Sequence, residues 1–421
     1  MIKKFIIPIF LLFSIVSLAQ QATSSPYSFY GIGDVRFKGT LENRLMGGIS
    51  IFPDSIHINI QNPASLSYLK LTSFTVGGGF NATKFNSYKG DEKAQRTTLD
   101  YLAVGVPLGK KAGLGFGLIP YSAVGYRIRT TDDTGVSSPT GTIRRYEGKG
   151  GLNKVYAGYS YKFTTNFSLG ASINYNFGNV ETTDIKYIPD VQYGALESNT
   201  SEMSGFNFNL GAMYQHKISK KTEIYGSLTY TPESDLKSTN VRTLSTILYT
   251  EDFDPAIYDS NDSETSKTTL KLPSTFAVGL GFGQAKKWLI GSEITLKESS
   301  GLKNRFSDVN NTTFENSVKY SFGGYYVPNY TSFSNYFKKV TYRAGFRYEN
   351  TGLVIRNESI KDYAYTLGFG LPMSGTFSNL NVGFEFGKRG TAKANLVQEN
   401  YTNVIISLSL NDKWFVKRKY D

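Results

Sequence analysis

The sequence predicts an all-β protein: a transmembrane antiparallel β-barrel of about 14 strands, preceded by an N-terminal hatch or plug. Three observations support this prediction. Apolar and polar residues alternate with period two along most of the chain. Many of the alternating stretches exceed the five or six residues usual for a strand in a soluble sheet. Short polar turns alternate with longer polar links, as at the two rims of an outer-membrane barrel.

Composition excludes several classes of protein. The 421 residues include no Cys, two His, 42 Gly, 30 Tyr and 29 Phe. Without Cys the chain has no disulfide framework and no thiolate metal site, and we expect neither a metal nor a cofactor. The net charge is +12, but Lys and Arg are scattered and do not form a basic patch interleaved with aromatics. We therefore expect no nucleic-acid partner.

The first residues have the pattern of a secretory signal. Lys3 and Lys4 precede an apolar run over residues 5–18, and small residues end at Ala19. The run is about 14 residues long, whereas a membrane-spanning helix needs roughly 20. We predict a signal peptide over 1–19, a hatch over 20–70, a β-barrel over 71–416 and a basic periplasmic tail over 417–421.

Alternation is clearest in the middle and at the end of the chain. Between Phe167 and Phe177 every second residue is apolar, and the residues between them are Ser, Gly or Asn. The segment from Leu380 to Phe386 alternates in the same way. This pattern gives each strand one apolar and one polar face. The predicted strands cover 71–88, 96–108, 112–131, 143–163, 167–188, 202–218, 222–247, 267–283, 286–303, 313–328, 336–350, 358–372, 377–389 and 397–416.

The connections between these strands are unequal. Tight polar turns are expected at 109–111, 164–166, 219–221 and 284–286, and long polar links at 132–142, 189–201 and 248–266. An even number of strands would place both termini on the periplasmic side. The soluble alternative is a pair of β-sandwich domains. Long strands, and the lack of a linker or a shift in composition, favour the barrel.

Residues 20–70 do not alternate. They contain Asn62, Pro63 and Ala64, in which Asn62 can cap a short helical turn that has Pro63 at its first position. An irregular segment of this length before a barrel is most easily placed inside it as a hatch. The alternative is a disordered periplasmic leader, although the segment has a high aromatic and aliphatic content for disorder.

These features resemble those of the outer-membrane long-chain fatty-acid and hydrocarbon transporters, the FadL-like family. The resemblance rests on Asn62-Pro63-Ala64 before the first strand and on Pro120, which resembles the interruption of the family's third strand. Ser25-Pro26-Tyr27 is also similar to the opening of outer-membrane proteins from Bacteroidota. The resemblance implies that the hatch blocks the lumen and that apolar ligands leave sideways into the bilayer. Members of this broad family also serve as barrel subunits of secretion machinery.

Two groups of strand residues are candidates for function. Pro120 either marks a lateral opening in the middle of a strand or lies harmlessly near a rim. The second group consists of charged residues on polar strand faces, which we expect in the lumen because a basic side chain facing lipid costs roughly 2–4 kcal/mol at the midplane. They would pair with one another or attract an anionic head group. The group comprises Glu293, Arg343, Arg347, Glu349 and Glu385.

The sequence does not indicate an enzyme, because neither His57 nor His216 has a Ser nucleophile motif nearby. We predict a passive outer-membrane transporter or channel for small hydrophobic or amphipathic ligands, in contact with outer-membrane lipid. The alternative is a non-transporting barrel subunit of a larger outer-membrane protein export or assembly complex. An exported soluble β protein is the third class of interpretation.

Overall fold

The computed structural model describes residues 23–88, 90–132, 141–189, 191–250, 253–302, 312–332 and 334–414. The predicted signal peptide and basic tail lie outside the described residues. Within those residues, no helix is long and apolar enough to cross a membrane.

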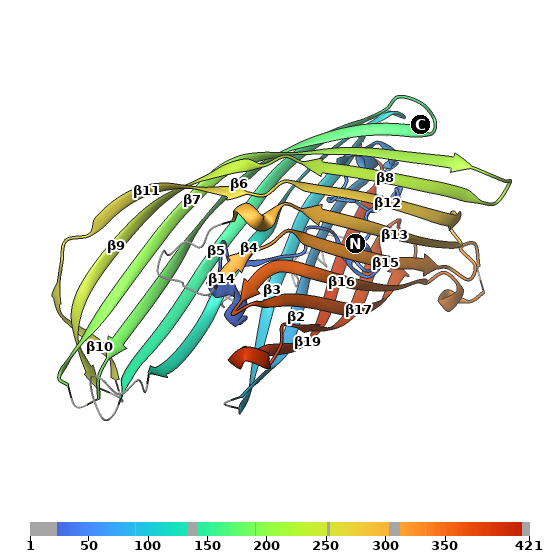
Figure 1. Cartoon of the computed structure of the whole chain (residues 1–421). Coiled ribbons are helices and arrows are strands. Elements are labelled where there is room, and N and C mark those ends of the chain that lie inside the picture. The colour runs from blue at the N-terminus through green and yellow to red at the C-terminus, as the bar shows by residue number, and fades with distance from the viewer. Residues whose placement is uncertain are drawn as a thin grey trace.

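The wall is a closed antiparallel barrel of 14 strands, which confirms the predicted fold class. Three wall strands are each formed by two consecutive elements: β8 with β9, β11 with β12, and β14 with β15 (Figure 1). The wall elements are β2 (Thr72–Ser87), β3 (Gly90–Leu108), β4 (Ala112–Asp132), β5 (Thr142–Lys162), β6 (Phe167–Tyr187), β7 (Tyr193–Lys217), β8 (Glu223–Thr231), β9 (Ser234–Thr250), β11 (Glu264–Leu272), β12 (Thr275–Gln284), β13 (Trp288–Lys297), β14 (Thr312–Phe314), β15 (Ser317–Tyr326), β16 (Thr341–Ile355), β17 (Glu358–Pro372), β18 (Asn379–Arg389) and β19 (Gln398–Asp412).

The barrel closes between its first and last wall strands. β19 pairs with β2 in an unbroken register from Gln398 opposite Asn86 to Asp412 opposite Thr72. The chain therefore enters and leaves the wall at the same rim. The predicted tight turns join β3 to β4, β5 to β6, β7 to β8 and β12 to β13 at this rim, which we call the short-turn rim.

The outer face carries an apolar belt. Alternate side chains point away from the lumen and are exposed in the isolated chain. A soluble protein rarely exposes so large a continuous apolar surface, and in a membrane barrel the lipid tails cover it. Examples from neighbouring strands are Leu169, Ile173, Phe206, Phe208, Leu228, Val278, Leu280, Ile290, Phe322, Leu367 and Ile406.

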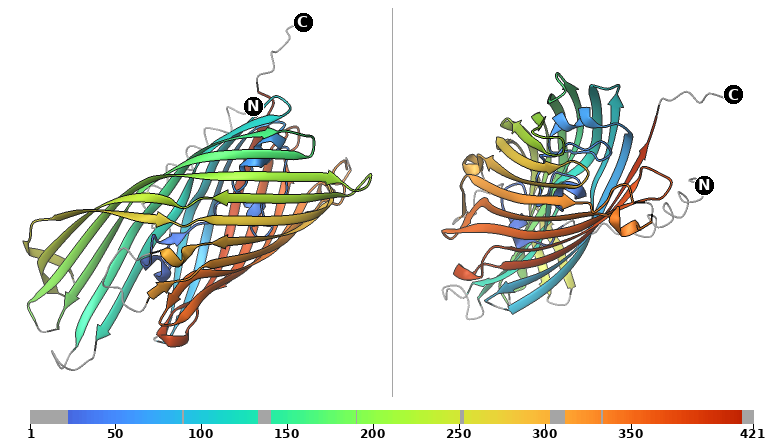
Figure 2. Two further views of the ribbon diagram at one scale, coloured as in Figure 1. Left: turned by 45° about the horizontal axis from the view of Figure 1, so that its top comes forward. Right: turned by 90° about the vertical axis from the view of Figure 1, so that its right-hand side faces the viewer.

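On the side opposite the short-turn rim, part of the wall continues as an open sheet (Figures 1 and 2). We call residues 121–132, 142–151, 179–204 and 234–272 the extension. Here β9 pairs with residues 193–204 of β7, with β11 and with the short β10 (Phe253–Ser260). The prediction of long loops at 189–201 and 248–266 is therefore wrong, because most residues of both links lie in strands. Ser, Thr and charged residues are frequent on both faces of these segments, so the apolar–polar alternation of the sequence is weak, although Ile143, Ile185 and Ile247 form a buried cluster on one face.

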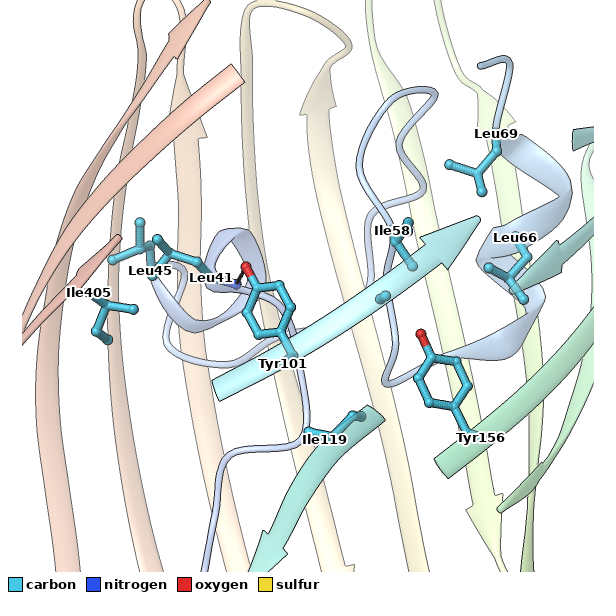
Figure 3. Packing of buried hydrophobic residues seen from close by; sticks show 10 residues of the cluster. Leu41, Leu45, Ile58, Leu66, Leu69, Tyr101, Ile119, Tyr156 and Ile405 are labelled. Carbon is cyan, nitrogen blue, oxygen red and sulfur yellow. Dashed lines mark hydrogen bonds between the residues drawn. The ribbon is translucent and has the colours of Figure 1, made fainter. Parts of the chain in front are cut away.

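The N-terminal segment, residues 23–71, packs against the inner wall (Figure 2). It contains η1 (Pro26–Phe29), β1 (Asp34–Val35), α2 (Leu41–Arg44) and η2 (Pro63–Tyr68). Leu41, Leu45, Ile58, Leu66 and Leu69 form one apolar cluster with wall residues such as Tyr101 (Figure 3). The Leu41 N–H donates to the Tyr101 hydroxyl at 3.0 Å. The main buried core of the molecule therefore lies between this segment and the lumen face of the wall.

Glycines in the wall let the N-terminal segment approach closely. A Cβ added to Gly170 would lie 2.5 Å from the carbonyl carbon of Pro63, and one added to Gly345 would overlap the backbone of Met46 and Gly47. Gly279 and Gly281 likewise face Ile51 and Phe52. Many inward-facing positions are therefore glycine because backbone or side chains of the N-terminal segment occupy the space of a side chain.

Candidate functional site

Asn62, Pro63 and Ala64 anchor the N-terminal segment to the wall. The Asn62 side chain accepts a hydrogen bond from the Ala64 N–H at 3.1 Å, with Pro63 at the first position of η2. Its amide nitrogen donates to the Ala212 carbonyl of β7 at 3.2 Å, and Asn209 of the same strand donates to the Gln61 carbonyl at 3.0 Å. The motif thus caps its own turn and also bonds the segment to β7.

Buried ion pairs join the segment to the opposite wall. Arg44 of α2 contacts Glu385 of β18 at 2.6 Å and Asp100 of β3 at 3.4 Å. Glu385 is fully buried and also pairs with Arg347 of β16, which in turn lies 3.5 Å from Asp362. A buried carboxylate is tolerated only with such partners. Arg389 pairs in the same way with Asp34 of β1 at 2.5 Å.

The five predicted charged residues have different partners. Arg347 and Glu385 pair with each other. Glu293 instead accepts from the N–H and hydroxyl of Ser50, at 2.9 and 2.7 Å, and Arg343 donates to Asn381 at 3.1 Å. Glu349 lies opposite Lys319 in the β15–β16 register. Ser50, Arg44 and Asp34 were not singled out from the sequence, because they lie in the segment without periodicity.

Pro120 lies in the interior of β4, at a break in the wall. β3 and β4 pair only from Leu108 opposite Ala112 to Leu102 opposite Leu118. The β4–β5 register then shifts between Pro120 and Ser122, and residues 121–126 are all buried. A strand buried on both faces has left the lipid-facing wall, so β4 bends into the lumen after Pro120.

The N-terminal segment supplies a partner for the bent part of β4. In β1, Asp34 pairs with Ala123 and Val35 pairs with Ser122. The Arg36 N–H also donates to the Tyr121 carbonyl at 3.0 Å. The edge that β3 leaves is therefore taken over in part by β1. Proline is suited to this position because it has no N–H to pair across the break.

Two cavities lie on either side of the N-terminal segment. One, of about 410 Å³, is lined on the two sides of the wall break by Asp100 and Tyr101 of β3 and by Pro120 and Tyr121 of β4. The other, of about 770 Å³, lies toward the short-turn rim and includes His57 and His216. The two have no lining residue in common. Residues 41–61 thus separate the two parts of the lumen.

His57 lies in the second cavity within a group of charged residues. Its Nδ1 is 2.8 Å from Asp54, and its Nε2 is 3.8 Å from Glu42. Burial disfavours the charged imidazole, but the carboxylate of Asp54 outweighs burial and the pKa of His57 is above 6.5. Burial likewise opposes the charge on Asp54, but His57 and the Ile56 N–H lower the pKa of Asp54 to about 2. No serine hydroxyl bonds to His57 among the described hydrogen bonds, and the group is an ion pair.

A family model described as BamG matches residues 1–421. The chain belongs to the BamG family. No curated protein sequence matches this BamG-family chain. Among solved structures it is similar to the Pseudomonas putida toluene transporter TodX, with 17% identity, a TM-score of 0.59 and coverage of 90% of this chain and 98% of that chain.

Two further structures are similar to the BamG-family chain. The CymD monoaromatic hydrocarbon channel has 13% identity and a TM-score of 0.56, and covers 90% of this chain and 98% of that one. A Pseudomonas aeruginosa FadL homologue has 15% identity, a TM-score of 0.57 and the same coverage. The predicted resemblance to FadL-like proteins is thus confirmed at the level of the fold. A transmembrane barrel with this apolar belt is an outer-membrane architecture, and lipid contacts its belt.

Proposed function

We propose that this chain is a passive outer-membrane channel for small hydrophobic or amphipathic ligands. The main support for this proposal is the wall break at Pro120, because residues on both sides of the break line the 410 Å³ cavity. A ligand in this cavity could leave sideways between β3 and β4 without crossing the separated second cavity. The N-terminal segment acts as the hatch, and Asn62, Pro63 and Ala64 hold it to β7. The short-turn rim and both termini face the periplasm.

In this proposal β1 is the movable part of the wall. Its ladder with β4 involves only two residues, and its release would break this ladder together with the ion pair of Asp34 with Arg389. Release of β1 would leave the edge of β4 that faces β3 unpaired beyond Pro120, with β5 still paired on the other edge, and would enlarge the lateral opening. The structural neighbours are described as a channel and a transporter, which fits a non-enzyme, and the absence of catalytic activity stays a prediction.

A disulfide between β1 and β4 tests this mechanism. Val35 and Ser122 are direct partners in the antiparallel register, and the chain has no Cys of its own. The double variant Val35→Cys, Ser122→Cys should form a single disulfide. We expect oxidised cells carrying it to take up radiolabelled decanoate no faster than cells without the chain, and reduction to restore wild-type uptake.

The two single variants are the controls, because each has one thiol and cannot form this intramolecular bond. Both should keep wild-type uptake under oxidising conditions. Uptake by the oxidised double variant at the wild-type rate would contradict the movement of β1. A wild-type chain that adds nothing to uptake would contradict the channel itself.

A second candidate function, a barrel subunit of a larger envelope complex, is favoured by the extension. Its sheet carries exposed apolar side chains on strands that are otherwise rich in Ser and Thr. Ile257 and Tyr258 are 63% and 64% exposed, and the ring centroids of Tyr258 and Tyr193 lie 5.1 Å apart. Exposed apolar groups of this kind, outside the lipid belt, are typical of protein contact surfaces.

Purification in mild detergent distinguishes this candidate from the channel. A subunit should copurify with a stoichiometric protein partner, and the double variant Ile257→Asn, Tyr258→Asn should lose it. Thr265→Asn on the exposed part of β11 is the matched control and should retain the partner. Recovery of the wild-type chain alone would contradict this candidate and leave the decanoate test to decide the channel.

A further inference from the structure

Four lysines from distant parts of the chain line the 410 Å³ cavity. Lys38 belongs to the N-terminal segment, Lys154 to β5, Lys297 to β13 and Lys319 to β15. Lys297 lies opposite Ser317, two residues from Lys319, so these two lysines are diagonal neighbours on adjacent strands. Lys154 lies opposite Ile119, next to the wall break.

Lys38 is at the centre of this group. Its Nζ lies 4.4 Å from the centre of the Tyr121 ring, on the bent part of β4. It interacts electrostatically with Lys319, Lys154 and Lys297, and with Glu349. The segment thus brings a fourth ammonium group toward three that belong to the wall.

Charge in this group is not balanced. Glu349 lies opposite Lys319, and its carboxylate interacts electrostatically with Lys38. Asp34 pairs with Arg389, whereas Glu293 accepts hydrogen bonds from Ser50 and has no cationic partner among the described ion pairs. No ion pair found among the described residues involves any of the four lysines. Four lysines against the two carboxylates of Glu349 and Glu293 leave an excess of positive charge in a cavity partly shielded from water.

We propose that Lys38, Lys154, Lys297 and Lys319 bind an anionic group with at least two negative charges, of the phosphate or phosphate-ester class. Lysine binds phosphate as a compact point charge, and several lysines can share the oxygens of one group. A monocarboxylate would leave part of the excess charge uncompensated. The site is independent of the proposed channel, because an anion can bind there whether or not a hydrophobic ligand passes.

The electrostatic environment of Lys38 favours the binding of a negatively charged group. Burial, together with the positive charge of Lys319, lowers the pKa of Lys38 to about 8, although Glu349 acts in the opposite direction. A bound phosphate group would favour the charged form of Lys38. It would also link the N-terminal segment to β5, β13 and β15.

Calorimetric titration of the mature full-length chain in detergent tests the site. Inorganic phosphate should bind, and acetate at equal ionic strength should bind at least tenfold more weakly. Lys297→Met should weaken phosphate binding at least tenfold. Lys237→Met is the control, because Lys237 is exposed on β9 in the extension, and it should bind phosphate like the wild type.

Competition measurements identify the source of the phosphate group, and a second lysine variant replaces one that does not fold. Glycerol 3-phosphate and detergent-solubilised phosphatidic acid each support the site if they compete with phosphate, and the stronger competitor shows whether the group belongs to a soluble ester or a lipid. Lys154→Gln, on the other side of the cavity, replaces Lys297→Met if the latter does not give the heat-modifiable folded form. Equal binding of phosphate and acetate, or wild-type affinity in the folded lysine variants, would overturn the proposal.

Discussion

At the scale of single residues, the pair of His57 and Asp54 couples stability to pH. The pKa of His57 is above 6.5, because the attraction of Asp54 exceeds the cost of burial. The protonated imidazole therefore stabilises the fold fully below the unfolded-state pKa, and this contribution is lost as the pH rises through the raised folded-state pKa. Asp54 has the opposite sign: its contribution is present above 3.8 and is lost as the pH falls toward about 2.

The variant His57→Gln should remove this dependence. We expect the wild type to unfold at a higher temperature than His57→Gln at pH 5, and the difference to shrink as the pH rises above neutrality. Heat-modifiable mobility of the full chain in detergent, measured between pH 5 and 9, gives the unfolding temperature. His216→Gln, at the exposed end of β7, should follow the wild type. Parallel curves for the wild type and His57→Gln would exclude the coupling.

Single residues also show how far the sequence is informative. The Asn62 cap could be predicted because a cap and its proline are neighbours in the chain. The inward orientation of Arg347 and Glu385 follows from the period of their strands. The contact of Glu385 with Arg44 could not be predicted, since it joins residues more than 300 positions apart and depends on where a segment without periodicity settles inside the closed wall.

At the scale of elements, the wall strands and the N-terminal segment pack closely because the wall has glycine, which lacks a side chain, at many of the contacts. Gly345 of β16 faces Met46 and Gly47, and Thr366 of β17 accepts a hydrogen bond from the Gly47 N–H at 3.2 Å. A methyl group at Gly345 would overlap backbone atoms, which cannot turn aside as a flexible side chain can. The fit between β16 and the segment therefore depends on glycine.

We expect Gly345→Ala to displace the N-terminal segment and to make it more sensitive to protease in the folded barrel. Overpacking of this kind typically costs about 1–3 kcal/mol, so the unfolding temperature should also fall. Gly226→Ala on β8 is the matched control, because the added Cβ would meet no atom nearer than 3.9 Å. Limited proteolysis with identification of the released N-terminal peptides distinguishes the two variants. Identical cleavage would show that the segment is not held by this contact.

Elements with one apolar and one polar face were predictable, and those with two polar faces were not. β6 was expected at 167–188 and spans Phe167–Tyr187. β7 was expected to begin at residue 202 but begins at Tyr193, and β10 was not expected. Period two is clear in a sequence only where apolar and polar residues are kept to opposite faces of a strand, and in the extension Ser and Thr occur on both faces, including buried positions such as Ser238 and Ser245.

At the scale of the whole molecule, the apolar belt and the extension divide the barrel into a lipid-covered and a water-covered part. Leu280 of β12 is 69% exposed within the belt. On β11, which continues the same wall strand into the extension, the exposed positions are Thr, Ser, Lys and Glu. The boundary between bilayer and water therefore crosses this wall strand near the junction of its two elements.

This boundary predicts opposite effects of one substitution at two positions. Leu280→Arg should reduce the yield of folded barrel in lipid vesicles, because an arginine facing lipid costs roughly 2–4 kcal/mol near the midplane. Thr265→Arg, at an exposed position of β11, should fold like the wild type. The folded fraction is read from heat-modifiable mobility after refolding into vesicles. Equal yields for both variants would place Leu280 outside the bilayer.

The seam between β2 and β19 has a consequence for biogenesis. It joins the start and the end of the wall in one continuous ladder, and residues 23–71 precede β2 in the chain but finish enclosed by all the strands that follow. Residues 23–71 therefore have to enter the lumen before β19 pairs with β2, because afterwards they would have to be threaded into a closed barrel whose lumen they fill. Synthesis delivers them first and closure comes last, so the order of the chain is also the order in which the molecule can be put together.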